Sequence, residues 1–292
     1  MPGRRGSALA GAGPCLRTGT SVRKPSGRKT VEKTKISQDL ASELYSAMRN
    51  RKTIPLISRR HPEFTVEDAY GVSMAVLQHR QASGEKLVGK KIGLTAKPVQ
   101  QLLGIDEPDF GFLTDAMEIP NGAAVAIADH MMTPMIEAEI ALIMKAPLPT
   151  SGVTPEMVLE ATGSVAACFE LVDTRFDTQK IGIVDTVADN ASSALYVLGD
   201  ERVDPKSLDL AGVTCDVYRN GEKTLSGEGA AVMGSPLNSV AWLANKIGSF
   251  GVSIDAGDVV LPGSVVPFAP IAPGDTYKAE FEGIGTVTCR FE

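Results

Sequence analysis

The chain has 292 residues, 43% of them hydrophobic, with a formal net charge of −6 at pH 7 and a pI near 5.3. This length and apolar content suffice for a sizeable core. The acidic balance argues against nucleic acid as a partner, because a phosphate-binding surface normally carries a basic excess. No apolar run approaches the length of a membrane-spanning helix, and the four cysteines lack a CxxC spacing. We therefore expect a cytoplasmic protein with no zinc site, disulfide framework or membrane partner.

The N-terminal stretch is basic. Residues 1–31 contain seven Arg and Lys residues, and no acidic residue precedes Glu32. Such a segment is typical of disorder, so we expect residues 1–35 to form a disordered basic tail. Import into an organelle is the alternative, although no amphipathic apolar stripe supports it.

The segment 36–85 carries the signals of a helical N-terminal region. Ser37 is a plausible N-cap for a first helix, because apolar residues follow it at helical spacing. Thr65 and Asp68 form a capping-box-like pair before a second helix, and Gly84 marks its end.

The remaining segment, 86–292, has a different texture. Short apolar runs are separated by Gly, Pro, Asn and Asp, which is typical of strands. Asn220-Gly221 is a hairpin signal, and one clear helix follows Ser235 as cap with Pro236 in its first turn. The predicted fold class is α+β, with a mixed, strand-rich catalytic body after the helical region.

The stretch MIEAEIALIM, residues 135–144, places Glu137 and Glu139 among apolar residues. Strand alternation puts both carboxylates on one face. Two carboxylates in an apolar setting are costly unless a cation meets them. That cation is either a pair of Lys or Arg side chains or a divalent metal. The alternative is a half-exposed edge strand with solvated glutamates.

A third carboxylate, Glu170, lies in the apolar stretch AACFELVDTRF. In isolation it has nearly even odds of facing solvent, with Asp173 and Arg175 as a surface ion pair. Together with Glu137 and Glu139 it makes a site for a hard cation the more economical interpretation. Mg²⁺ or Mn²⁺ suits such all-oxygen ligation.

Upstream, the adjacent Lys90 and Lys91 point to opposite faces if they lie on a strand. An inward lysine beside a metal site would polarise a substrate oxygen or relay a proton, and a solvated lysine pair is the alternative. Asp109, in EPDFG, is by itself an ordinary turn aspartate. Ser192, in the polar cluster DTVADNASS, either contacts a ligand or caps a turn.

Six blocks, in order, resemble one known family. They are GKKIGLTAKPVQQLLGIDEPDFGFLTDAM, IEAEIA, CFELVDTRF, DTVADNASS, GSPLNSVAWLAN and AGDVVLPGS. The family is the 2-keto-4-pentenoate hydratase and 4-oxalocrotonate decarboxylase group of the fumarylacetoacetate hydrolase superfamily, and the resemblance covers residues 37–292. It implies a rolled mixed β-sheet body after a helical N-terminal region, and a homo-oligomer.

The same resemblance implies roles for individual residues. Glu137, Glu139 and Glu170 match the family's ligands for Mg²⁺ or Mn²⁺. Lys91, before IGLT, and Asp109, in PDFG, match its catalytic positions. With the DTVADNASS cluster taken as touching ligand, we expect Lys91 and Ser192 to contact the substrate.

The implied activity is a metal-dependent hydratase, a hydro-lyase of the meta-cleavage breakdown of aromatic or steroid rings. It would add water to a small 2-hydroxy-2,4-dienoate to give a 4-hydroxy-2-keto acid. Blocks such as PDFGFLTDAM and SPLNSVAWLAN favour the hydratase branch, whereas AEIALIMKAPL has decarboxylase character. The alternatives are a 4-oxalocrotonate decarboxylase, a more distant acylpyruvate-type C–C hydrolase and a non-catalytic metal-binding partner subunit of a pathway complex. A complex with a neighbouring pathway enzyme is compatible with the predicted hydratase activity.

Overall fold

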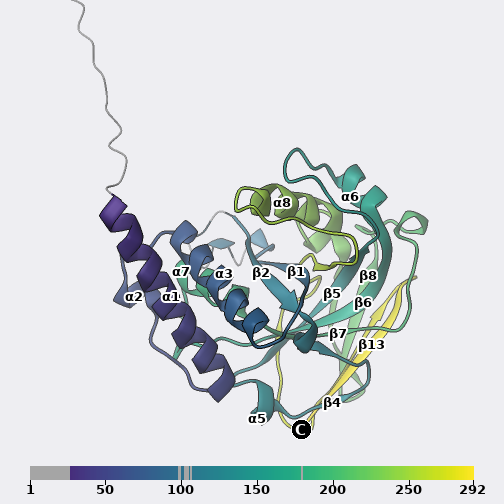
Figure 1. Ribbon diagram of the computed structural model, residues 1–292. Coiled ribbons are helices and arrows are strands. Elements are labelled where there is room, and N and C mark those ends of the chain that lie inside the picture. Colours follow the sequence, from purple (N-terminus) through teal and green to yellow (C-terminus); the bar gives the residue numbers. More distant parts are fainter. Residues whose placement is uncertain (1–26, 98–99, 102–104, 106, 179) are drawn as a thin grey trace, which may run out of the picture.

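The computed structural model describes residues 27–97, 100, 101, 105, 107–178 and 180–292. Its helices lie at parts of the periphery of a body of two sheets (Figure 1). The helices are α1 Gly27–Asn50, α2 Ile57–Arg60, α3 Val66–Ala82, α5 Ile127–His130, α6 Pro155–Ala161, α7 Ile183–Ala188 and α8 Pro236–Gly248, with short 3₁₀ turns η1 Asp115–Met117, η2 Asn190–Ser192, η3 Pro205–Ser207 and η4 Gly229–Ala231.

The N-terminal region is helical, as expected, but it begins earlier. Helix α1 starts at Gly27, so residues 27–35 belong to it and Ser37 lies inside the helix instead of capping it. An ion pair of 2.6 Å between Lys33 Nζ and Asp68 Oδ2 joins this early part of α1 to α3. Such a tertiary contact lies outside what local propensity can indicate. The rest of the predicted tail, residues 1–26, lies outside the described residues.

Other local signals are confirmed. Thr65 caps α3 through a capping box with Asp68. Ser235 caps α8 by accepting a hydrogen bond from Leu237 N at 3.3 Å. Asn220 and Gly221 both have positive φ, 55° and 87°, as a two-residue hairpin turn requires.

The larger sheet runs in the order β2-β1-β10-β5-β6-β7-β3, and β11 pairs with β5. It mixes parallel and antiparallel pairs: β1 is parallel to β10 and antiparallel to β2. Its strands are β1 Leu87–Gly93, β2 Asp109–Thr114, β3 Glu118–Ile119, β5 Met135–Met144, β6 Thr162–Val172, β7 Ser193–Leu198, β10 Val259–Leu261 and β11 Ala269–Pro270.

The smaller sheet has the order β4-β13-β12-β8-β9. Its strands are β4 Ala124–Val125, β8 Thr214–Arg219, β9 Glu222–Glu228, β12 Thr276–Phe281 and β13 Gly285–Phe291. Figure 1 shows α1, α2, α3 and α7 together on one side of the body, while α6 and α8 lie together at another. This arrangement confirms the expected α+β class, with mixed curled sheets after a helical N-terminal region.

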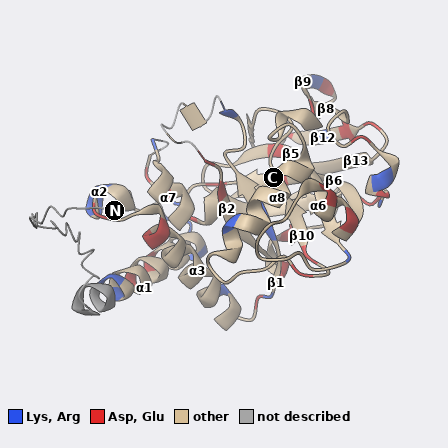
Figure 2. Cartoon of the chain, turned by 90° about the horizontal axis from the view of Figure 1, so that it is seen from above, with Lys and Arg blue, Asp and Glu red and all other residues tan. Residues whose placement is uncertain are grey.

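The central strands have apolar sequences because they are buried. Strands β5 and β6 are each other's principal neighbours and are buried along most of their length. Charged residues of both signs lie interspersed on the outer elements, including α1 and the β8–β9 hairpin (Figure 2). Within the described ranges, no helix has the length and apolarity needed to cross a membrane.

Candidate metal and active site

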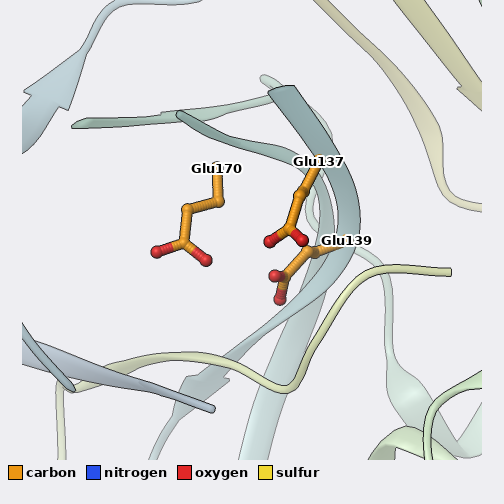
Figure 3. Close-up of side chains that lie close together, drawn as sticks. All are labelled: Glu137, Glu139 and Glu170. Atoms are coloured by element: carbon orange, nitrogen blue, oxygen red, sulfur yellow. The ribbon is translucent and has the colours of Figure 1, made fainter. Parts of the chain in front are cut away.

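Three glutamates converge on one face of the larger sheet. Strands β5 and β6 are antiparallel, and their register sets Glu137 directly opposite Glu170. Glu139 follows two residues later on β5 and therefore shares that face. A carboxylate oxygen from each of the three lies within 4.8 Å of the others. Figure 3 shows the three side chains turned toward one another.

The protein itself supplies few hydrogen-bond donors to these carboxylates. Glu139 and Glu170 are fully buried, at 0% exposure, whereas Glu137 is partly exposed. Glu139 Oε2 accepts a hydrogen bond from Gly263 N at 2.8 Å. Glu139 Oε1 and both oxygens of Glu170 have no hydrogen-bond partner among the described residues. Because buried acceptors are normally paired, this donor set fits a hard divalent cation. The solvated-edge alternative is wrong.

Burial and mutual repulsion make the cluster hard to ionise without a cation. Burial, and then the charge of Glu170, raise the pKa of Glu137 to about 7. The same causes raise the pKa of Glu139 well above its ordinary value. A bound divalent cation would remove this penalty, because opposite charge favours the carboxylate form.

Lys91 faces the cluster from β1. Its Nζ lies 3.3 Å from Glu170 Oε2 and donates a hydrogen bond to the Ala191 carbonyl at 2.9 Å. Burial alone would lower the pKa of this ammonium, but the surrounding carboxylates, led by Glu170, hold it above its usual value. Lys90 points to the opposite face and pairs with Asp258. Both lysines are buried, so the solvated-pair alternative is wrong.

Asp109 begins β2 beside Lys91. A Cβ on Gly93 would lie 2.3 Å from Asp109 Oδ1 and 3.3 Å from Lys91 Nζ, so both groups border that glycine. Asp109 Oδ2 accepts a hydrogen bond from Thr186 Oγ1 at 3.0 Å, whereas Oδ1 has no partner within the described part of the chain. Burial raises the pKa of Asp109, and Lys91 and Thr186 oppose that rise.

The expected substrate ligand Ser192 lies in a strained turn. Asn190, Ala191 and Ser192 have φ of 57°, 50° and 57°, a left-handed conformation that costs roughly 1–2 kcal/mol per residue. The Ala191 carbonyl of this turn contacts Lys91. Ser192 Oγ is buried without a hydrogen-bond partner in the described residues, so its hydroxyl is available to a ligand.

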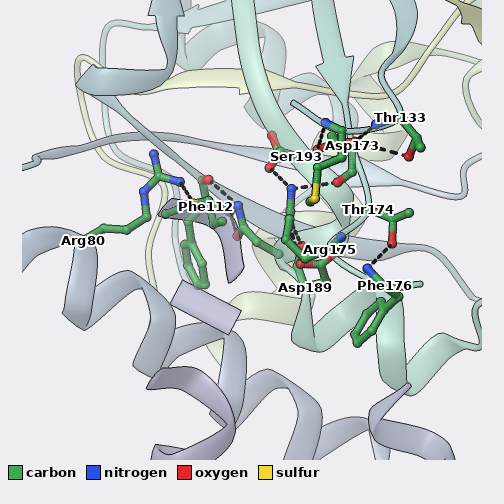
Figure 4. Close-up of polar contacts among 12 residues, drawn as sticks. Arg80, Phe112, Thr133, Asp173, Thr174, Arg175, Phe176, Asp189 and Ser193 are labelled. Atoms are coloured by element: carbon green, nitrogen blue, oxygen red, sulfur yellow. Dashed lines mark hydrogen bonds and ion pairs between the residues drawn. The ribbon is translucent and has the colours of Figure 1, made fainter. Parts of the chain in front are cut away.

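The interpretation of Asp173 and Arg175 as a surface pair is wrong. Both side chains are buried, at 3% and 5% exposure. Arg175 pairs instead with Asp189, while Asp173 accepts hydrogen bonds from Met132 N at 2.9 Å and Thr133 N at 2.7 Å (Figure 4). This network supports the end of β6, which carries Glu170.

A cavity of about 420 Å³ opens beside Glu137. Its lining is mostly apolar, and Glu137 is the one charged residue among the described residues that line it. The apolar wall includes Ile92, Leu94, Val265, Val266 and Phe268. Phe268 is 53% exposed and lies at the rim. The cavity therefore offers one carboxylate, Glu137, in a mostly apolar lining.

Two contributors at this site were not singled out from the sequence, and a third, Asn190, was noted only as a member of the polar cluster DTVADNASS. Gly263 supplies a backbone N–H to Glu139, Thr186 supplies a hydroxyl to Asp109, and Asn190 anchors the turn next to Lys91. Gly263 lies in the LPGS block and Asn190 in the DTVADNASS block. The partners of all three are distant in sequence.

Comparison with known proteins identifies the family. Residues 69–292 match the fumarylacetoacetate hydrolase C-terminal domain. The 2-hydroxyhexa-2,4-dienoate hydratase of Comamonas testosteroni is 50% identical over 249 residues, which cover 85% of this chain and 94% of that protein. The 2-hydroxypent-2,4-dienoate hydratase of Pseudomonas putida is 49% identical over 225 residues, 76% of this chain and 100% of that protein.

A solved structure supports the same family assignment. The 4-oxalocrotonate decarboxylase from Pseudomonas putida G7, complexed with magnesium and adipate, superposes with a TM-score of 0.86 at 35% identity, covering 88% of this chain and 98% of that chain. The chain thus belongs to the 2-keto-4-pentenoate hydratase and 4-oxalocrotonate decarboxylase family of the fumarylacetoacetate hydrolase superfamily.

Proposed function

We propose that this protein is a divalent-metal-dependent hydratase that adds water to a 2-hydroxy-2,4-dienoate and gives a 4-hydroxy-2-keto acid. The observation that carries the proposal is the convergence of Glu137, Glu139 and Glu170 within 4.8 Å, where three buried oxygens of Glu139 and Glu170 accept no hydrogen bond from the described residues. The two relatives at 50% and 49% identity, both named hydratases, support this reaction class.

Glu137, Glu139 and Glu170 would hold the cation, and we propose Mg²⁺ or Mn²⁺, which take carboxylate oxygens and keep positions open for substrate or water. The bound cation would supply positive charge opposite the oxyanion that develops at the C2 oxygen of the substrate. The magnesium in the decarboxylase complex is consistent with this choice.

Lys91 would act on the same oxygen. Its raised pKa keeps the ammonium charged at neutral pH, so it is a donor, not a base. We assign it to the C2 oxygen, where its hydrogen bond stabilises the negative charge that develops as the C2 hydroxyl loses its proton. The C5 carbon gains a proton in the same conversion, and the product is the α,β-unsaturated 2-keto acid.

Asp109 is the proposed base for the second stage. Water adds to that ketone, with hydroxide at C4 and a proton at C3. Asp109 Oδ1 is free of protein partners in the described structure, and the Thr186 hydroxyl fixes the other oxygen at 3.0 Å. A carboxylate with a raised pKa, held in this way, suits removal of a proton from water. We assign Ser192, next to the Ala191 carbonyl, to substrate binding.

The cavity beside Glu137 bears on the choice between hydratase and decarboxylase. A decarboxylase substrate such as 2-oxohex-3-enedioate carries a second carboxylate. The cavity wall has no Lys, Arg or His among its described residues, and a buried carboxylate without a cationic partner is costly. Its apolar wall suits the hydrocarbon end of a dienoate, so the hydratase is the favoured reaction.

The deciding experiment mixes the protein with freshly generated 2-hydroxypenta-2,4-dienoate, with Mg²⁺ or with a chelator. Loss of the dienol absorbance is followed, and the product is identified by mass. We expect metal-dependent loss with the gain of one water. No reaction here, together with CO₂ release from 2-oxohex-3-enedioate, would move the assignment to the decarboxylase. Metal binding without any turnover would support a non-catalytic partner subunit.

We also propose that the chain works as a homo-oligomer in the cytoplasm, by itself or with a neighbouring pathway enzyme. The family resemblance supports oligomerisation. Light scattering of the purified protein measures the molar mass directly, and a monomeric mass of 30.8 kDa would contradict the proposal.

A further inference from the structure

The turn beside Lys91 has an unusual backbone. Asn190, Ala191 and Ser192 all have positive φ, between 50° and 57°, although none is a glycine. Asn adopts this conformation singly, but other residues with a Cβ rarely do, and three in succession are unusual. Strain of this kind persists only where surrounding contacts enforce it, and it is concentrated at functional sites.

The enforcing contacts come from two directions. Asn190 Oδ1 accepts a hydrogen bond from Phe112 N at 2.7 Å, and its Nδ2 donates to Phe112 O at 2.9 Å. A Cβ on Gly111 would lie 2.5 Å from Asn190 O, so the glycine permits this close approach. On the other side, Arg175 donates to the carbonyls of Asp189 and Ser193, which flank the turn (Figure 4).

These contacts fix the position of the Ala191 carbonyl. Ala191 O accepts a hydrogen bond from Lys91 Nζ at 2.9 Å. The distance from Lys91 Nζ to Glu170 Oε2 is 3.3 Å, whereas the other lysine–carboxylate pairs of the described residues are 2.8 Å or shorter. A buried ammonium attracted by several carboxylates is expected to contract onto the nearest one. The Ala191 carbonyl opposes that contraction.

We propose that the left-handed turn Asn190–Ser192 is a positioning device that holds the Lys91 ammonium away from Glu170, and that Asn190 anchors it. Glu170 then stays available to a divalent cation, and Lys91 stays available to substrate. The inference rests on the proposed metal site. Without the anchor, Lys91 moves onto Glu170 and competes with the cation, so metal affinity and turnover fall together.

The test compares Asn190→Ala with Asn245→Ala. Asn245 is a matched control, because its side chain also holds one backbone residue, accepting from Val153 N and donating to Val153 O, each at 2.9 Å. Mn²⁺ binding is measured from the electron paramagnetic resonance signal of the free ion, and kcat is measured with saturating Mn²⁺. We expect Asn190→Ala to weaken Mn²⁺ binding and lower kcat about 10-fold or more. Asn245→Ala should lower the melting temperature only.

A Lys91→Met background identifies the cause. If Lys91 is the competitor, Asn190→Ala has no further effect on Mn²⁺ affinity once the ammonium is gone, a coupling that independent sites do not show. An equal loss of affinity in both backgrounds, or wild-type affinity in Asn190→Ala, overturns the inference. Should Asn190→Ala fail to fold, Asn190→Asp decides: its carboxylate still accepts from Phe112 N but cannot donate to Phe112 O. We expect weaker Mn²⁺ binding than in wild type, with no such loss in the Lys91→Met background, and wild-type affinity overturns the inference.

Failure of the proposed function gives a different pattern. The Mn²⁺ measurements need no substrate, so a chain that binds Mn²⁺ but leaves every dienol untouched contradicts the hydratase while the positioning inference is still decided by the metal affinities. A wild-type chain that binds no Mn²⁺ overturns both.

Discussion

Two adjacent lysines on β1 are both buried, but the charge around them is balanced for one and unbalanced for the other. Lys90 and Lys91 are both almost fully buried, at 1% and 2% exposure, and strand alternation sends them to opposite faces of the sheet. Lys90 meets one carboxylate, Asp258, which also accepts a hydrogen bond from Asp255 N at 2.7 Å. Charge is balanced one to one there, and the polar groups are satisfied.

Lys91 meets an excess of negative charge. Four carboxylates influence its pKa, in the order Glu170, Asp109, Glu137 and Glu139, and several of their oxygens lack a donor among the described residues. One ammonium cannot neutralise four acids, so this face calls for a further cation. The comparison teaches that a buried charge is not evidence of function by itself; unbalanced buried charge is the informative feature.

The largest expected effect is on catalysis at Lys91. Lys91→Met should lower kcat by about 10²–10⁴-fold, because the proposed donor at the developing oxyanion is lost. Mn²⁺ binding should become no weaker, since the substitution removes positive charge beside the ligands. Steady-state kinetics with the dienol and Mn²⁺ titration measure the two quantities. A variant with wild-type kcat would remove Lys91 from the reaction.

Lys90→Met should show the reverse pattern. Removing one partner leaves the Asp258 carboxylate buried and unpaired, which costs about 3–5 kcal/mol in the free energy of unfolding. The folded fraction should retain kcat, since Lys90 lies on the face of β1 opposite Lys91 and pairs with Asp258 instead of with the three glutamates. Urea denaturation gives the first quantity, and activity per folded molecule gives the second. Loss of kcat without loss of stability would contradict the division of labour between the two lysines.

How far the sequence alone predicts this site depends on distance along the chain. The shared face of Glu137 and Glu139 follows from strand alternation, because the two are only two residues apart. Register with Glu170 was not predictable, since pairing of β5 with β6 is a tertiary property. Residue patterns left Glu170 nearly undecided in isolation and favoured a cation site once it was taken with Glu137 and Glu139. The family resemblance then assigned it as a metal ligand.

The wrong predictions also concern residues whose partners are distant in sequence. Arg175 looked like the partner of Asp173, two residues away, but its partner is Asp189, brought close by the fold. The partner of Lys90 is 168 residues distant, so its burial was unforeseeable. Helices α3 and α8 were predicted with their caps, because capping boxes and N-terminal Ser-Pro pairs are local signals.

The excess of negative charge should also make the stability of the metal-free protein and its Mn²⁺ affinity depend on pH. Burial and Glu170 raise the pKa of Glu137 to about 7. In the metal-free protein Glu137 therefore binds a proton between its ordinary pKa and about 7, where the unfolded chain does not. By linkage, its contribution to stability is lost as pH rises through that window, and Mn²⁺ affinity falls as pH drops below 7, because the ion must displace protons.

Glu137→Gln isolates this dependence. Without metal, the stability of wild type relative to Glu137→Gln should decrease between pH 5 and pH 7. Chemical denaturation of both proteins without metal, repeated across that range, measures the difference. A difference that is flat or increases with pH would show that Glu137 does not carry the raised pKa.

The smallest expected effect tests whether the Lys90 pair is replaceable. In Lys90→Met/Asp258→Asn both charges are gone, while the Asn oxygen can still accept the hydrogen bond from Asp255 N. Replacing both members of a buried ion pair is often close to neutral, so stability should return to within about 1–2 kcal/mol of wild type. Urea denaturation of the single and double variants measures this recovery. No neutral replacement of Lys91 and the carboxylates around it should recover kcat, because in the proposed mechanism their charges act on substrate and metal. If the double variant is as unstable as Lys90→Met, the two faces of β1 do not differ in the way their charge balance indicates.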